Sequence, residues 1–174
     1  CPTTNMTTPI LCPAGSYCPN GTANPFPCPA GTFSNATGLS RESECTLCTT
    51  GHYCNVTGQT AVTGECAAGF YCALGSVTPT PTGVYPANGP CPAGAYCTAG
   101  TLAPTWCSVG TFTSQTGRTL PSDCVECTPG SYCNSSGLTS TSGLCAAGYY
   151  CPTSVSSFQP AAYVCPQGYR YIVN

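Results

Sequence analysis

The cysteines of this chain recur every 79 residues without a gap, and this repeat constrains the fold more than any other feature of the sequence. The first set is Cys12, Cys18, Cys28, Cys45, Cys48, Cys54, Cys66 and Cys72, and the second is Cys91, Cys97, Cys107, Cys124, Cys127, Cys133, Cys145 and Cys151. Such a repeat indicates a tandem architecture in which each unit packs on its neighbours. We therefore expect the end of one repeat at residues 1–11, full repeats at 12–90 and 91–164, and the start of another at 165–174.

A smaller sub-unit of the form Cys-x-x-Gly-x-aromatic occurs four times in each repeat. The sub-units, numbered 1 to 8 here, begin at Cys12, Cys28, Cys48, Cys66, Cys91, Cys107, Cys127 and Cys145. The glycine three residues after each leading cysteine, the first glycine, predicts a tight turn with a positive φ. The aromatic residue five positions after the cysteine predicts a short strand in which the ring covers a disulfide or a neighbouring backbone. This small packing core is favoured over a sugar-stacking ladder.

The composition favours a scaffold held by disulfides. Leu, Ile, Val and Phe make up 24 of the 174 residues, which is thin for a hydrophobic core, whereas there are 18 cysteines. Pro and Gly number 18 and 20, and they interrupt every candidate helical stripe. We expect a small disulfide-rich fold, mostly coil with short β-hairpins and no helices of note, stacked as an elongated tandem-repeat rod.

Cysteines and glycosylation motifs together indicate the compartment. Structural disulfides persist outside the cytosol. Five of the eight asparagines lie in Asn-x-Ser/Thr motifs, namely Asn5, Asn20, Asn35, Asn55 and Asn134. We expect an extracellular or cell-surface, secreted glycoprotein, with any export signal or anchor outside this sequence. The Thr/Pro-rich connector between the repeats adds Thr78, Thr80 and Thr82 as weaker O-glycosylation candidates.

The charge and the distribution of apolar residues exclude two classes of partner. The chain has three arginines and no lysine, with a formal net charge of −2, so it lacks the clustered positive charge of a nucleic-acid surface. No stretch of 18 apolar residues could span a bilayer, so we expect no membrane insertion. The expected partners are further copies or repeats, by self-association into a filament or by continuation of a longer array, together with covalent glycans.

Two Cys-x-x-Cys motifs, which begin at Cys45 and Cys124, could form half of a zinc site or a redox pair. The sequence offers neither the further ligands nor the helical context that these sites need, so structural disulfides are favoured. His52 is the only histidine, and the second repeat has Ser131 in its place. A surface role is therefore favoured over a catalytic one for His52.

The remaining distinctive residues also point away from an enzyme. Glu44 and Asp123 correspond across the repeats, but neither has a carboxylate or histidine beside it in the sequence. Trp106 breaks the repeat, because Pro27 occupies its place in the first one, and a packing contact is favoured over a binding hot spot. We expect no catalytic residues, no metal and no cofactor.

Residues 28–34 (CPAGTFS), followed by Cys45-Thr-Leu-Cys48, resemble the cysteine-rich modules named after the ephrin receptors. Residues 108–112 with 124–127 match the pattern again, and the resemblance extends from Cys12 to Cys151. It implies a tandem array in an extracellular protein, as in large surface proteins of protists and other aquatic organisms. The chain departs from that pattern by an extra cysteine directly after the aromatic residue in three sub-units out of four.

In modules of this kind the cysteine before the glycine pairs with the next cysteine. Carried over, this implies Cys28–Cys45 and Cys107–Cys124, and by extension Cys12–Cys18, Cys48–Cys54, Cys66–Cys72, Cys91–Cys97, Cys127–Cys133 and Cys145–Cys151. A rival scheme joins each trailing cysteine to the next leading one (Cys18–Cys28, Cys54–Cys66, Cys72–Cys91) and closes both Cys-x-x-Cys motifs. The sequence alone leaves both schemes open. Under the local rule Cys1 and Cys165 have no partner in the chain, so we expect them to bond to neighbouring repeats or subunits.

Two functions fit these features. The first is a structural repeat segment of an extracellular glycoprotein fibre, appendage or surface coat, because every repeat is equivalent and no singular site is required. The alternative is a spacer or ligand-binding ectodomain of a cell-surface receptor or adhesin, in which residues that break the repeat would form a binding face.

Overall fold

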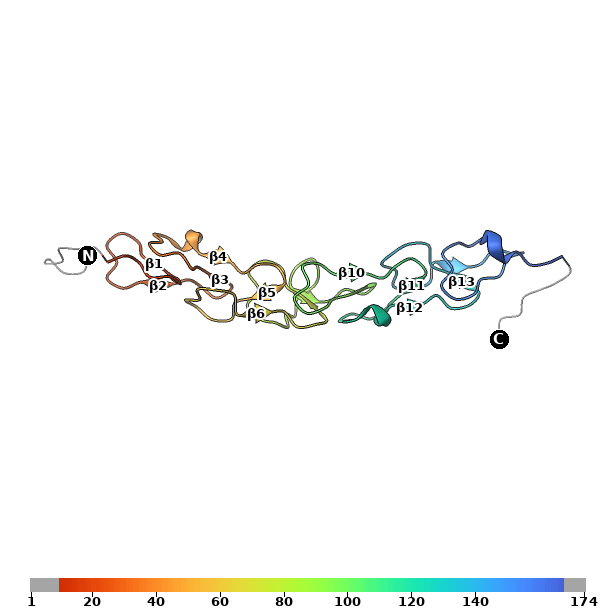
Figure 1. The fold of residues 1–174 in the computed structure, drawn as a ribbon, viewed down its shortest axis with the longest axis horizontal. Coiled ribbons are helices and arrows are strands. Elements are labelled where there is room, and N and C mark those ends of the chain that lie inside the picture. Colours follow the sequence, from red (N-terminus) through yellow and green to blue (C-terminus); the bar gives the residue numbers. More distant parts are fainter. Residues whose placement is uncertain (1–9, 168–174) are drawn as a thin grey trace. The chain divides into compact units, whose positions relative to one another are not determined.

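The computed structural model describes residues 10–167, which are mostly loop with seven two-stranded antiparallel hairpins (Figure 1). The pairs are β1 (Ser16–Tyr17) with β2 (Phe26–Pro27), β3 (Thr32–Phe33) with β4 (Thr46–Leu47), β5 (His52–Tyr53) with β6 (Gly64–Glu65), β7 (Phe70–Tyr71) with β8 (Gly89–Pro90), β9 (Ala95–Tyr96) with β10 (Thr105–Trp106), β11 (Thr111–Phe112) with β12 (Val125–Glu126), and β13 (Ser131–Tyr132) with β14 (Gly143–Leu144). A bridge between Tyr149 and Val164 takes the corresponding place in sub-unit 8. The predicted disulfide-rich, mostly coil fold with short hairpins is confirmed.

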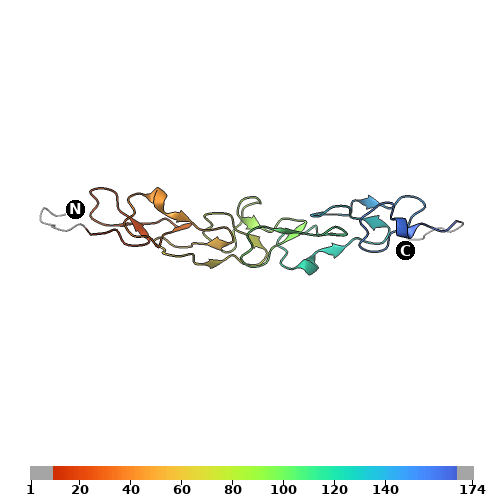
Figure 2. The same cartoon turned by 45° about the horizontal axis from the view of Figure 1, so that its top comes forward.

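Helical structure within residues 10–167 is limited to three short 3-10 turns, η1 (Glu42–Glu44), η2 (Pro121–Asp123) and η3 (Ala161–Tyr163). Figure 2 shows each of them as a single turn within loop. The prediction of no helices of note is confirmed for this part of the chain.

Each hairpin pairs two residues, the aromatic residue of the sub-unit and the one before it, with the two residues before the next leading cysteine. All eight first glycines have a φ between +77° and +89°, as the turn prediction requires. In the register, Tyr17 lies opposite Phe26 and Tyr53 opposite Gly64. The Tyr53 ring covers that glycine, since a Cβ atom there would lie 3.5 Å from Tyr53 Cε1. The predicted cover of a neighbouring backbone is thus confirmed for Tyr53.

Cysteine makes up most of the buried core. Among residues 10–167, thirteen of the fifteen buried apolar residues are cysteines, and the other two are Ala95 and Val155. The aromatic residues at the fifth position are half-buried rather than enclosed. The interior of the sub-units is therefore largely disulfide, and the rings of Tyr53 and Tyr132 cover the glycines opposite them, Gly64 and Gly143.

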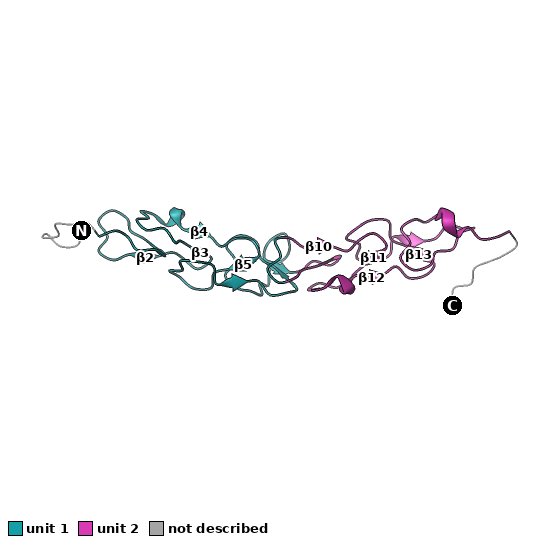
Figure 3. Ribbon diagram, viewed as in Figure 1, with its two compact units in different colours: residues 1–90, 99–102 teal, residues 91–98, 103–174 magenta. Residues whose placement is uncertain are grey.

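The described chain divides into two compact units, coloured in Figure 3. Unit 1 contains residues 1–90 and 99–102, and unit 2 contains residues 91–98 and 103–174. The first boundary lies between Pro90 and Cys91, where the second repeat begins. Residues 99–102 belong with unit 1, in which Gly100 N–H donates a hydrogen bond to Cys66 O at 3.0 Å.

Four main-chain hydrogen bonds join consecutive sub-units within a unit. We call the sixth residue after each leading cysteine the trailing position. The N–H of the first glycine donates to the main-chain carbonyl at the trailing position of the next sub-unit. The carbonyl of the first glycine accepts from the N–H of the next leading cysteine. A second glycine lies nine or ten residues after its own leading cysteine, and its N–H donates to the carbonyl of the leading cysteine of the previous sub-unit. The carbonyl of the residue after this second glycine accepts from the N–H at the trailing position of the previous sub-unit. Between sub-units 1 and 2 the bonds are Gly15 N–H to Ser34 O (2.8 Å), Cys28 N–H to Gly15 O (2.9 Å), Gly38 N–H to Cys12 O (2.8 Å) and Cys18 N–H to Leu39 O (2.9 Å).

These four bonds recur between sub-units 2 and 3, 3 and 4, 5 and 6, 6 and 7, and 7 and 8. The second-glycine positions all have positive φ, and they are Gly21, Gly38, Gly58, Gly75, Gly100, Gly117, Gly137 and, in sub-unit 8, Ser154. The bonds use main-chain groups only, so they constrain the two glycine positions and leave most other side chains free to vary.

Candidate functional site

Eight disulfides join each leading cysteine to the next cysteine along the chain. They are Cys12–Cys18, Cys28–Cys45, Cys48–Cys54, Cys66–Cys72, Cys91–Cys97, Cys107–Cys124, Cys127–Cys133 and Cys145–Cys151. These are the pairs that the resemblance to the ephrin-receptor modules implies, and the described residues form none of the rival pairs. Cys45 and Cys48 belong to different bridges, so this Cys-x-x-Cys motif holds no thiolate for a metal or a redox reaction.

Cys165 forms no disulfide with any residue from 10 to 167, and Cys1 lies outside the described residues. The main chain of Cys165 nevertheless occupies the place of a leading cysteine, because its N–H donates to Gly148 O at 2.8 Å.

The described N-glycosylation motifs all lie in the same loop of their sub-units, between the trailing position and the second glycine. Asn20, Asn35, Asn55 and Asn134 are all exposed there, in sub-units 1, 2, 3 and 7. Asn5 lies outside the described residues. Of the O-glycosylation candidates, Thr80 and Thr82 are exposed and Thr78 is half-buried.

Asn55 and Asn134 are each held by the same pair of hydrogen bonds, which we call the amide clasp. The Thr63 hydroxyl accepts from Asn55 N–H (3.2 Å) and donates to Asn55 Oδ1 (2.9 Å). In the second repeat the Ser142 hydroxyl accepts from Asn134 N–H (3.1 Å) and donates to Asn134 Oδ1 (2.8 Å). In the first repeat alone, the amide of Gln59 also bonds to Thr63, at 2.7 Å. Sequence reasoning found the asparagines but missed the hydroxyl residues that hold them.

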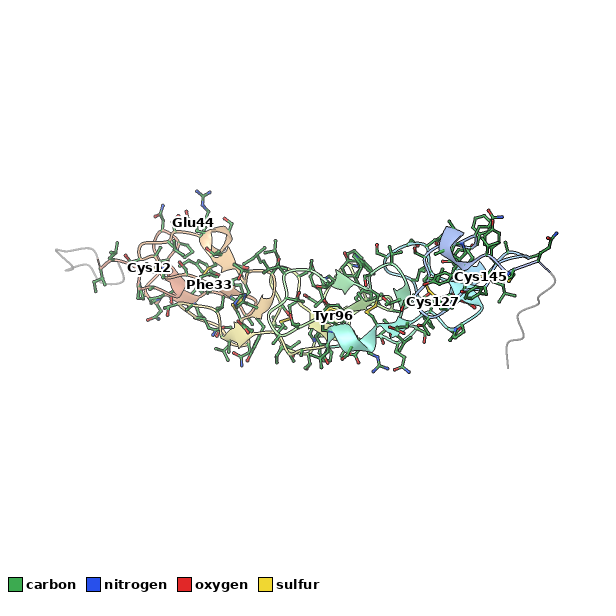
Figure 4. The ribbon with its side chains drawn as sticks, turned by 45° about the vertical axis from the view of Figure 1, so that its right-hand side comes forward. Cys12, Phe33, Glu44, Tyr96, Cys127 and Cys145 are labelled. Atoms are coloured by element: carbon green, nitrogen blue, oxygen red, sulfur yellow. A yellow bond between two sulfur atoms is a disulfide. The ribbon has the colours of Figure 1, made fainter. Side chains whose placement is uncertain are left out.

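Glu44 lies on η1 and closes the turn that leads into it (Figure 4). Its carboxylate accepts hydrogen bonds from Ser40 N–H (2.6 Å) and Arg41 N–H (3.3 Å), and Arg41 Nε lies 3.3 Å from it. The hydrogen bond from Ser40 is the main cause that holds the pKa of Glu44 below its ordinary value, although partial desolvation opposes it.

Asp123 has the same position on η2 of the second repeat. Its carboxylate accepts from Leu120 N–H and Thr119 N–H, both at 2.9 Å, and Arg118 Nη1 lies 3.7 Å away. The hydrogen bond from Leu120 N–H is the main cause that lowers the pKa of Asp123, and the bond from Thr119 N–H acts in the same direction. The correspondence between Glu44 and Asp123 is therefore explained by turn capping.

A hollow of about 210 Å³ lies beside this second turn, lined by Phe112, Thr113, Gln115, Arg118, Asp123 and Val125 among others. Arg118 Nε is buried and has no hydrogen-bond partner within the described residues. Arg118 stands where the first repeat has Leu39, so the guanidinium at this place is particular to the second repeat.

Trp106, the only tryptophan, lies over the second glycine of sub-unit 7 and is 45% exposed. A Cβ atom at Gly137 would lie 3.0 Å from Trp106 Cε3. Pro27 lies in the same way over Gly58, where the corresponding distance is 3.4 Å. Trp106 thus makes the packing contact that was favoured for it, although nearly half of its surface faces solvent.

The His52 ring lies beside its own turn, with Nδ1 3.3 Å from both Thr49 Oγ1 and Thr50 O, and the His52 backbone pairs with Glu65 in the hairpin. Residues 10–167 contain no group of three or more His, Cys, Asp or Glu that could hold a metal ion.

The chain matches no known protein-family model and no curated protein sequence. Over the described range, no helix has the length and apolar character needed to cross a membrane.

Proposed function

We propose that this chain is a structural repeat segment of an extracellular glycoprotein fibre, appendage or surface coat. The observation that carries the proposal is the set of four main-chain hydrogen bonds between consecutive sub-units. Each set makes a sub-unit both donor and acceptor toward its neighbour. Any further sub-unit that keeps the two glycine positions could therefore extend the stack.

Three other observations support the proposal. The eight disulfides suit an oxidising compartment, which favours an extracellular location. The four described glycosylation asparagines are exposed in one recurring loop. The resemblance to ephrin-receptor cysteine-rich modules favours a tandem array over an isolated domain.

We further propose that Cys1 and Cys165 bond to neighbouring repeats, either in a longer polypeptide or between subunits that associate head to tail. Head-to-tail contacts generate open filaments, unless the rotation between subunits closes them into a ring. Non-reducing electrophoresis of the native material separates these cases. Disulfides between subunits predict oligomers that dissociate on reduction. A longer polypeptide predicts one large species both with and without reductant.

Electron microscopy of native material tests the structural function. Uniform filaments or a continuous coat with a periodic repeat would support it. Isolated molecules with a distinct terminal head would contradict it and favour the alternative, a spacer or ligand-binding ectodomain of a receptor or adhesin. One observation favours that alternative, namely the hollow beside Arg118, because this arginine has no counterpart in the first repeat, where Leu39 takes its place.

A further inference from the structure

We propose that the N-glycan on Asn134 packs on the indole ring of Trp106, which makes Trp106 a carbohydrate-contacting residue. The ligand is a pyranose ring from the innermost part of the glycan. The inference rests on the proposed glycoprotein nature of the chain, and all the residues involved belong to unit 2.

The amide clasp sets the direction in which this glycan leaves the protein. Ser142 Oγ donates to Asn134 Oδ1 at 2.8 Å and accepts from Asn134 N–H at 3.1 Å. The sugar replaces a hydrogen on Nδ2, so Oδ1 remains an acceptor in the glycosylated residue and the clasp persists. Nδ2 is the amide atom not engaged by Ser142, and the glycan extends from it.

Trp106 lies within reach of that glycan. Its ring lies against Gly137, which follows Asn134 by three residues in the same exposed loop. Three residues span at most about 11 Å even when fully extended, and this loop turns. The first sugars on Asn134 therefore start close to the ring, and Gly137 has no side chain to separate them.

The ring offers the surface that a sugar requires. Trp106 is 45% exposed, so part of the indole is open to solvent beside the loop. The face of an aromatic ring is electron-rich and attracts the slightly positive C–H groups on the apolar face of a pyranose. Covering the exposed part of the ring also removes apolar area from water. The contact would stabilise the ring and the loop together.

The first repeat supplies a matched control within the same molecule. Asn55 has the same exposed loop and the same clasp, but proline, Pro27, takes the place of Trp106. A glycan on Asn55 therefore meets no indole. Since Trp106 is the only tryptophan, its fluorescence reports on this one contact.

The test uses the full 174-residue chain, secreted from a cell that adds N-glycans, with occupancy at each asparagine determined by mass spectrometry. Tryptophan emission and its quenching by acrylamide are compared for the parent, Asn134→Gln and Asn55→Gln. We expect Asn134→Gln to show a red-shifted emission and about twofold stronger quenching, because the ring loses its cover. Asn55→Gln should match the parent. Enzymatic removal of the glycan from the folded parent should reproduce the Asn134→Gln result, which guards against misfolding of that variant.

Ser142→Ala tests the role of the clasp. We expect quenching between that of the parent and that of Asn134→Gln, with Asn134 still glycosylated. Equal emission and quenching in parent, Asn134→Gln and deglycosylated parent, with Asn134 occupied, would overturn the Trp106 contact and leave the proposed function standing. An unmodified Asn134 in the secreted protein would overturn both the contact and the glycoprotein assignment at this site.

Discussion

At the scale of single residues, the two glycine positions of a sub-unit are constrained in different ways. The first glycine has a positive φ, and at Gly15, Gly31, Gly51, Gly94 and Gly110 it also lies against the backbone of the sub-unit two places further along. A Cβ atom at Gly31, where φ is +85°, would lie 2.6 Å from Gly75 O. A Cβ atom at Gly58, a second glycine with φ +75°, would meet Pro27 Cβ at an ordinary 3.4 Å.

This difference predicts the effects of alanine at the two positions. Gly58→Ala incurs the cost of a left-handed backbone, about 1–2 kcal/mol. Gly31→Ala incurs the same cost and also forces Gly75 to move, which adds roughly 1–3 kcal/mol. Denaturant unfolding with the disulfides intact measures both variants. Equal destabilisation by the two substitutions would show that the close backbone contact at Gly31 is absent.

Ser154 is the one non-glycine residue with positive φ in the described chain, at +63°. It occupies the second-glycine position of sub-unit 8, and Gly75 is its counterpart in the first repeat. We predict that Ser154→Gly raises the free energy of unfolding by about 1 kcal/mol, because it removes left-handed strain. The reciprocal change, Gly75→Ser, should lower it by at least as much. A loss of stability in Ser154→Gly would mean that the serine makes a compensating interaction.

At the scale of elements, the turns that lead into η1 and η2 depend on one carboxylate each. The folded-state pKa of both Glu44 and Asp123 is lowered, chiefly by hydrogen bonds from main-chain N–H groups. A depressed folded pKa means that the contribution to stability is present above the unfolded pKa and is lost as the pH falls through the folded pKa. Since unperturbed carboxyl groups titrate near pH 4, the loss should begin at about that pH and continue below it.

Amide hydrogen exchange at Thr119 and Leu120 tests the second turn. We predict that protection of these amides, measured at neutral pH, falls in Asp123→Asn, because a neutral side chain accepts hydrogen bonds more weakly than a carboxylate. In the parent, protection corrected for intrinsic exchange should decrease as the pH is lowered below about 4. Glu44→Gln serves as the control, since it should affect η1 and leave Thr119 and Leu120 unchanged. Protection that is independent of residue 123 would rule out the cap.

The local elements were predictable because their determinants lie within a few residues of one another. Gly31 and Phe33, for example, define a turn and a strand within one short motif. The connections between sub-units were not predictable in the same way. Gly58 N–H bonds to Cys28 O across 30 residues, and nothing beside Gly58 in the sequence indicates that partner. The recurrence of second glycines 79 residues apart, as at Gly58 and Gly137, was the available signal.

The candidate site shows the same division. The exposed asparagines could be predicted from the motif itself, whereas the clasp on Asn134 could not, because Ser142 lies eight residues away across a hairpin. The roles of Glu44 and Asp123 were also missed, since their partners are main-chain N–H groups, which any residue except proline supplies.

At the scale of the whole molecule, cysteine takes the place of an aliphatic core. Thirteen of the fifteen buried apolar residues in the described part of the chain are cysteines, so each sub-unit is organised around its own disulfide. In the chain-entropy model, closing one of the short loops stabilises the fold by about 2.4 kcal/mol and closing one of the longer loops by about 3.2 kcal/mol. We therefore expect the reduced chain to lose its tertiary structure.

Disulfide mapping of the unreduced protein by mass spectrometry, after alkylation under denaturing conditions, tests this account most directly. It should find the eight local bridges, with Cys28 joined to Cys45 and Cys48 to Cys54, and no alkylated cysteine from Cys12 to Cys151. A Cys45–Cys48 bridge, a Cys18–Cys28 bridge, or substantial alkylation at Cys45 or Cys48 would contradict it.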